Sequence, residues 1–132
     1  MRFALLTIVA AASLAVAVQA AEHTKDTLLT IKESVEKGKA VLVDVRENKE
    51  WDEGHIDGAV FLPLSAIQDG LSNDELAKLP KDKILYVHCV VGKRALTAGN
   101  AIEKAGFTVR PIKPGFKELL EAGLPKAKPS KD

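Results

Sequence analysis

Hydrophobic and polar positions form two kinds of block along the chain. Short apolar runs rich in valine and isoleucine are typical of strands buried on both faces of a parallel sheet. We expect four such strands, at residues 40–45, 59–62, 84–88 and 107–112. Between them, apolar residues recur at helical spacing, and helices are expected at residues 25–37, 65–79 (one or two helices), 94–105 and 115–122. Strands that alternate with helices predict an α/β fold with a mainly parallel sheet.

The first 20 residues follow a different pattern. Arg2 precedes an uncharged apolar stretch, and Val18-Gln19-Ala20 has the small-x-small form that signal peptidase accepts. We therefore expect a periplasmic or secreted protein with no membrane span after cleavage. The expected organisation is a signal peptide at 1–20, an N-terminal helical segment at 21–39, the main domain at 40–125 and a polar tail at 126–132.

The charge of the chain is balanced in total but not in distribution. The formal net charge is +1, whereas domains that bind nucleic acid are usually strongly basic, so no nucleic-acid partner is expected. Residues 21–80 carry 7 Lys and Arg against 13 Asp and Glu, and residues 81–132 carry 11 against 5. The single cysteine lies in the basic half, which favours an anionic substrate or a thiolate there.

Cys89 is the only cysteine, so no intramolecular disulfide can form and no CxxC redox motif exists. The three histidines lack the ligand spacing of a structural zinc site, and no metal is expected. A lone thiol in an exported protein is either buried and inert or present for its reactivity.

The segment around Cys89 favours reactivity. Cys89 directly follows the strand at 84–88, and ligands of open α/β sheets bind at the carboxyl ends of strands. The next short loop leads into a helix N-terminus, which favours negative charge. Gly92 lets the loop curl with its amides inward, and Lys93 and Arg94 add positive charge. The pattern predicts a nucleophilic thiolate beside an anion-binding loop, and a core cysteine at a strand end is the alternative.

Three ordered motifs then resemble the single-domain rhodanese family over about residues 40–125. The first comprises Asp44-x-Arg46, Glu50 and Gly54-His55-Ile56-x-Gly58-Ala59. The second is similar to the family's active loop and reads Cys89-Val90-Val91-Gly92-Lys93-Arg94. The third looks like its C-terminal motif and comprises Gly115-Phe116 and Ala122-Gly123-Leu124-Pro125. The resemblance implies a small parallel sheet of about five strands, flanked by helices on both faces.

The resemblance also implies a rhodanese-type sulfurtransferase with Cys89 as its catalytic residue. The cysteine would take a sulfane sulfur from a small anionic donor (thiosulfate, polysulfide or a persulfide) and pass it to a small thiol, a protein thiol or cyanide. Neither a metal nor an organic cofactor is expected, and a monomer suffices. The expected substrate-binding residues are those of the loop and one arginine of the first motif: Val90, Val91, Gly92, Lys93, Arg94 and Arg46.

Several alternatives remain open at this level. Arg46 lies four residues from Glu50 and could pair with it in a structural role. Cys89 to Arg94 is Cys-x4-Arg, whereas cysteine phosphatases and arsenate reductases use Cys-x5-Arg, so phosphate or arsenate chemistry is not favoured. Val91 stands where two-domain thiosulfate:cyanide enzymes carry a basic residue, which counts against thiosulfate as the natural donor.

Two functions without sulfur transfer are also compatible with the sequence. A non-catalytic rhodanese-like module would bind a partner or sense redox state, and the apolar pair Val90-Val91 could form its contact patch. Alternatively, the thiol could simply form mixed disulfides or a disulfide-linked dimer on oxidation. His88 is expected to point away from Cys89, because neighbouring side chains of a strand alternate, so we do not expect it to act as a base.

Overall fold

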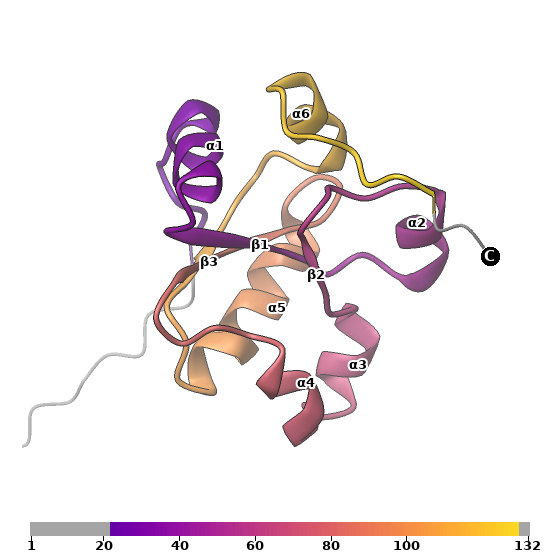
Figure 1. Cartoon of the computed structure of the whole chain (residues 1–132). Coiled ribbons are helices and arrows are strands. Elements are labelled where there is room, and N and C mark those ends of the chain that lie inside the picture. The colour runs from indigo at the N-terminus through magenta and orange to yellow at the C-terminus, as the bar shows by residue number, and fades with distance from the viewer. Residues whose placement is uncertain (1–21, 130–132) are drawn as a thin grey trace, which may run out of the picture.

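The computed structural model describes residues 22–129, so the expected signal peptide at 1–20 and the end of the polar tail lie outside the described residues. The four strands form one parallel sheet in the order β2-β1-β3-β4. Figure 1 labels the first three of these strands in the middle of the molecule. Their bounds are β1 (Ala40–Asp44), β2 (Val60–Phe61), β3 (Ile84–His88) and β4 (Val109–Pro111). All four strands predicted from the hydrophobic runs are therefore present, and the α/β class with a parallel sheet is confirmed.

The sheet has four strands among the described residues rather than about five. The chain before the first helix reaches the edge of β4, where the Thr24 N–H donates to the Pro111 carbonyl at 2.7 Å. This segment makes no further ladder with β4, and one backbone bond does not make a strand. The described residues therefore form four strands, one fewer than the resemblance implies.

Six helices connect and cover the strands within the described residues. Their bounds are α1 (Leu28–Glu36), α2 (Asn48–Glu53), α3 (Leu64–Gln68), α4 (Asn73–Ala77), α5 (Lys93–Lys104) and α6 (Phe116–Glu121). The helix expected from residue 25 begins three residues later, because the Thr27 hydroxyl accepts the Thr30 N–H at 3.2 Å and caps α1. The stretch 65–79 forms two helices, since Gly70 adopts a φ of +98° and Ser72 caps the second helix.

The helices cover both faces of the sheet, as Figure 1 shows with α1 and α6 above it and α3, α4 and α5 below. Alternate residues of β3 enter different cores: Leu85 and Val87 pack with the α5 side, and Tyr86 packs with the α1 and α6 side. Both faces of the central strands are thus buried, which explains their continuous apolar sequence. Small residues on α5 allow this helix to approach the sheet closely. A Cβ on Gly99 of α5 would lie 2.7 Å from the ring of Pro111 in β4.

The parallel arrangement brings the carboxyl ends of the strands to one edge of the sheet. Asp44 at the end of β1 is in register with His88 at the end of β3, and Cys89 follows directly. The segments that leave this edge therefore surround the cysteine. Within residues 22–129, no helix has the length and apolar character required to span a bilayer.

Candidate active site

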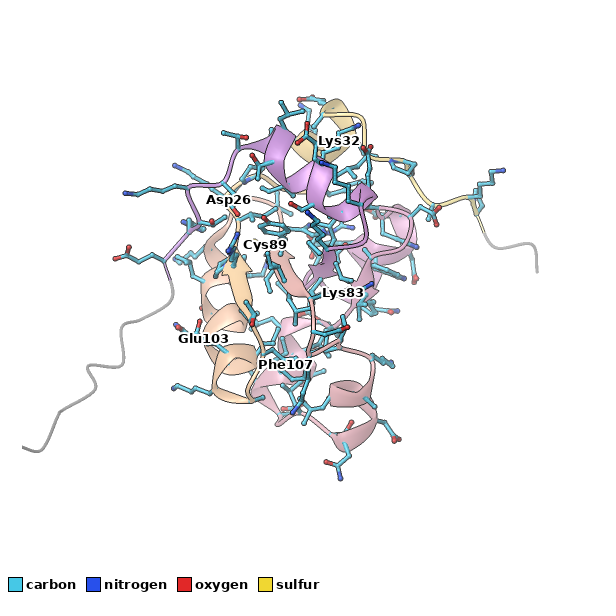
Figure 2. All side chains as sticks on the ribbon, turned by 60° about the vertical axis from the view of Figure 1, so that its left-hand side comes forward. Asp26, Lys32, Lys83, Cys89, Glu103 and Phe107 are labelled. Atoms are coloured by element: carbon cyan, nitrogen blue, oxygen red, sulfur yellow. The ribbon has the colours of Figure 1, made fainter. Side chains whose placement is uncertain are left out.

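Cys89 lies one residue beyond β3 and is 1% exposed, in the interior of the molecule (Figure 2). The loop after it turns back, so that the Gly92 N–H donates to the Cys89 Sγ at 3.1 Å. Gly92 is the N-cap of α5 and has a left-handed φ of +91°. The first amides of a helix have no partner inside the helix and attract negative charge. The sulfur therefore sits where an anion is stabilised, in agreement with the sequence pattern.

Gly92 cannot be replaced without moving its neighbours. A Cβ at this position would lie 2.7 Å from the His23 Nε2 and 3.0 Å from the Lys113 Cα. Its positive φ also disfavours any side chain. Both the backbone conformation and the space around it require glycine at the point where the loop contacts the sulfur.

Gly115 is required by space alone. Its φ of −103° is open to any residue, but a Cβ would lie 2.1 Å from the Val90 carbonyl oxygen and 2.7 Å from that of Cys89. The next residue, Phe116, donates its N–H to the Cys89 carbonyl at 3.3 Å. The connection between β4 and α6 thus packs against the backbone carbonyls of Cys89 and Val90 and supports the loop that begins there.

Arg94, at the start of α5, pairs with Glu50 of α2. Two parallel bonds join them, Nη1 to Oε1 at 2.6 Å and Nη2 to Oε2 at 2.9 Å. The Arg94 hydrogen bond holds the pKa of Glu50 well below its ordinary value, at about 2. The same hydrogen bond raises the pKa of Arg94. Glu50 therefore does not form the pair with Arg46 that the spacing allowed, because the tertiary fold brings a guanidinium from 44 residues away.

Arg46 instead pairs with Asp44 in the interior. Its Nε and Nη2 donate to the Asp44 carboxylate at 3.0 and 2.7 Å, and Nη2 also donates to the Gly54 carbonyl at 2.7 Å. The guanidinium lies over the Phe116 ring, 4.5 Å from its centroid. These contacts occupy the side chain in holding the first motif together. A direct contact between Arg46 and substrate stays a prediction.

His88 is fully buried on the Asp44 side of the sheet. Its Nε2 is 4.0 Å from the Asp44 Oδ2, and neither ring nitrogen has a hydrogen-bond partner among the described residues. Burial lowers its pKa, so the ring is neutral. This placement agrees with the expectation that His88 points away from the sulfur.

The outer surface of the loop is apolar. Val90 is 46% exposed and Val91 is 71% exposed, and both line a shallow pocket of about 350 Å³ with Lys113, Pro114 and Glu118. The side chain of Lys93 is also exposed. Of the predicted site residues, the structure brings Cys89, Gly92 and Arg94 together, whereas Val90, Val91 and Lys93 turn their side chains to solvent. Only backbone groups of these three could face the sulfur.

Sequence reasoning missed two neighbours of the loop. His23 contacts Gly92 from the N-terminal segment, and Gly115 meets the Val90 carbonyl, although Gly115 was part of a recognised motif. No spacing signal marks either contact, because His23 lies 69 residues from Gly92. Glu50 was also recognised, but its pairing with Arg94 was not foreseen.

Comparisons with known proteins show the family of the chain. The family model of the rhodanese-like domain matches residues 27–122. A probable adenylyltransferase/sulfurtransferase of Mycobacterium tuberculosis, MoeZ, is 41% identical over 93 residues, which cover 70% of this chain and 23% of that protein. The chain thus spans about a quarter of the length of this relative. Human thiosulfate:glutathione sulfurtransferase is 30% identical over 105 residues, covering 72% of this chain and 91% of the human protein.

Solved structures show the same fold. The human single-domain sulfurtransferase superposes with a TM-score of 0.59 at 27% identity, covering 69% of this chain and 89% of that one. A rhodanese-related protein of Thermoplasma volcanium has a TM-score of 0.61 at 23% identity, covering 76% and 93%, and shows likeness of fold alone. Because the family model spans most of the chain and relatives named sulfurtransferases share its sequence and fold, the chain belongs to the rhodanese-like domain family.

Proposed function

We propose that this protein is a sulfurtransferase that carries sulfane sulfur as a persulfide on Cys89. The observation that carries the proposal is the hydrogen bond from the Gly92 N–H to the Cys89 Sγ at 3.1 Å, at the N-terminus of α5. A sulfur held by an inward-facing amide is stabilised when it is negatively charged. The relatives named sulfurtransferases support the reaction class.

In the first half of the reaction, the Cys89 thiolate attacks the terminal sulfur of the donor. With thiosulfate, a new S–S bond forms to Cys89, the donor's own S–S bond breaks, and sulfite leaves with the electron pair. The product is Cys89–S–S⁻, whose negative charge resides on the outer sulfur. Amides of the loop over residues 90–94 would stabilise this charge, and Gly92 already points at the site.

In the second half, an acceptor thiolate attacks the outer sulfur of the persulfide. The bond between the two sulfurs breaks, the acceptor leaves as a persulfide, and the electron pair returns to the Cys89 thiolate. Cyanide reacts in the same way and leaves as thiocyanate. Neither half needs a redox partner or a second cysteine in this chain.

The enclosure of the thiol restricts the donor. Cys89 is 1% exposed, which favours a donor with an unhindered terminal sulfur, such as thiosulfate, a polysulfide or a persulfide. The excess of basic residues over 81–132 favours an anion. The name of the human relative gives thiosulfate and glutathione as candidates for donor and acceptor.

The first test is intact mass spectrometry of purified protein before and after incubation with thiosulfate, polysulfide or glutathione persulfide. We expect a gain of one sulfur atom that a thiol or cyanide removes, and no gain in Cys89→Ala. Cys89→Ser is the matched control, because it keeps the size of the buried side chain without the nucleophile. Sulfur transfer that persists in both variants would refute the proposal.

The reaction would take place outside the cytoplasm if the signal-peptide pattern at residues 1–20 acts as predicted. Fractionation of cells that express the full chain tests this placement. We expect the processed protein in the periplasmic or secreted fraction, and unprocessed protein in the cytosol would contradict it.

A second function is favoured by the exposed pair Val90 and Val91. An exposed apolar patch can mark a surface that binds a partner, so a rhodanese-like binding or redox-sensing module is the alternative. This function requires saturable partner binding that survives Cys89→Ala. No gain of sulfur with any donor, on a thiol shown to be free by alkylation, would favour it over transfer.

A further inference from the structure

The N-terminal segment, residues 22–27, lies against the edge of the sheet before α1 begins. β4 is the outer strand on this side, so one row of its backbone groups faces away from β3. The Thr24 N–H donates to the Pro111 carbonyl on this edge at 2.7 Å. The segment is therefore attached to β4, the strand after which the chain runs to Gly115, the residue that packs against the loop after Cys89.

A carboxylate fixes the segment at a second point. The Asp26 Oδ2 accepts the Tyr86 hydroxyl at 2.6 Å and the Arg110 Nη1 at 2.8 Å. Burial raises the pKa of Tyr86, so its phenol stays protonated and donates. The Tyr86 hydrogen bond lowers the pKa of Asp26, so its carboxylate stays ionised and accepts. These two bonds join the segment to β3 and β4 at once. Figure 2 labels Asp26 in this segment.

Anchored in this way, the segment places His23 against the loop that surrounds the sulfur. The His23 Nε2 lies 2.8 Å from the Gly92 carbonyl oxygen. A carbonyl only accepts, so Nε2 carries the hydrogen and donates it. The same oxygen also accepts the Leu96 N–H at 3.3 Å, in the first turn of α5. Gly92 therefore receives a hydrogen bond at its carbonyl from His23 and gives one at its amide to Cys89.

The imidazole also packs directly on Gly92. The space that a Cβ would take at this residue is bounded by the His23 ring on one side and the Lys113 backbone on the other. A glycine has more accessible backbone conformations than any other residue, and nothing intrinsic to it selects a φ of +91°. Contact and hydrogen bond together hold Gly92 in the one conformation that points its amide at the sulfur.

We infer that His23 is a positioning residue for sulfur transfer: through the Gly92 carbonyl, it fixes the amide that stabilises negative sulfur at Cys89. It touches neither the sulfur nor the substrate. The inference rests on the function proposed above and adds to it a residue outside the recognised motifs. Its physical basis is preorganisation, because an amide that is already aimed costs no rearrangement when charge develops.

The test compares three variants in the N-terminal segment. His23→Ala removes the donor, His23→Gln places an amide N–H near the position of Nε2, and Lys25→Ala changes an exposed neighbour as the matched control. We expect His23→Ala to lower kcat about fivefold with a smaller change in KM, the factor that one ordinary hydrogen bond supplies. His23→Gln should recover most of the loss, and Lys25→Ala should match the wild type.

Two readouts separate positioning from general stability. The Gly92 amide resonance in a ¹H–¹⁵N spectrum of the thiol form should shift in His23→Ala and return toward its wild-type position in His23→Gln. Denaturation curves of the three variants show whether any loss of kcat follows stability instead. A kcat and a Gly92 resonance that are unchanged in His23→Ala would overturn the inference, as would a loss that His23→Gln does not recover.

Alkylation of Cys89 by iodoacetamide keeps this test independent of the proposed function. If the wild-type protein accepts sulfur from no donor, sulfurtransferase activity fails, and the alkylation rate at neutral pH then decides the role of His23. A slower rate in His23→Ala that His23→Gln restores supports positioning of the loop amide. Equal rates in all three variants overturn it.

Discussion

Two arginine–carboxylate pairs flank Cys89, and they differ chiefly in burial. The Arg46 and Asp44 side chains are 6% and 0% exposed, whereas those of Arg94 and Glu50 are 31% and 32% exposed. Water screens the outer pair and leaves it little net stability, but a buried charge that loses its partner is costly. The inner pair, Asp44 and Arg46, is therefore required for the stability of the fold, whereas the outer pair, Glu50 and Arg94, can be changed while the fold survives.

The largest effect should come from breaking the inner pair with Asp44→Asn. The change leaves the Arg46 guanidinium charged and buried without its counter-ion, which typically costs about 3–5 kcal/mol of the free energy of unfolding. Chemical denaturation measures this loss. Asp57→Asn is the matched control at an exposed position and should stay within about 0.5 kcal/mol of the wild type. If Asp44→Asn loses no more stability than Asp57→Asn, the inner pair is not required for the stability of the fold.

Gly115→Ala tests whether packing that stabilises the fold also controls sulfur transfer at Cys89. The added Cβ would collide with the Val90 and Cys89 carbonyls, and such overpacking costs about 1–3 kcal/mol. Because those carbonyls belong to the loop, we expect sulfur transfer to fall along with stability. Gly58→Ala is the control, since its φ of +81° brings backbone strain but nothing lies within 4 Å of the new Cβ. If Gly115→Ala loses stability as expected but keeps full sulfur transfer, the packing at Gly115 stabilises the fold without controlling the site.

The smallest effect should come from Glu50→Gln in the outer pair. At neutral pH we expect a loss of stability below about 1 kcal/mol, because a third of each side chain is exposed to solvent. The pKa of Glu50 falls from an ordinary 4.5 to about 2 in the folded state, so its contribution is present above pH 4.5 and is lost as the pH falls from there toward 2. The difference between wild type and variant should therefore shrink between pH 7 and pH 3. A difference that stays constant over this range would show that the ion pair contributes nothing.

The sequence predicted local features better than long-range contacts. Continuous runs such as Ile84–His88 marked the four strands, because burial on both faces favours apolar residues at most positions of a strand. Cys89 and Gly92 were also predictable, since a thiol between a buried strand and a helix N-terminus makes a chemical pattern by itself. Helix starts were less certain: the helix expected from residue 25 begins at Leu28, where the Thr27 hydroxyl caps it.

Pairing across the molecule could not be predicted in the same way. Arg46 and Glu50 have the spacing of a helical ion pair, yet β1 ends at Asp44 and α2 begins only at Asn48, so Arg46 lies in the intervening turn. The turn directs Arg46 inward to Asp44 and leaves Glu50 free for Arg94. The resemblance also implied about five strands, but the sheet of the described residues has four, and the N-terminal segment makes one backbone hydrogen bond to the edge of β4.

The sequence by itself determined the class of fold, the order of its four strands along the chain, and the one cysteine able to act as a sulfur nucleophile. These depend on periodicity and residue type, which are local properties. The tertiary structure decided which arginine serves which carboxylate, why Gly115 must be glycine, and that His23 reaches the loop around the sulfur. Those outcomes depend on distances between residues far apart in the chain, and only the packed sheet with its helices fixes such distances.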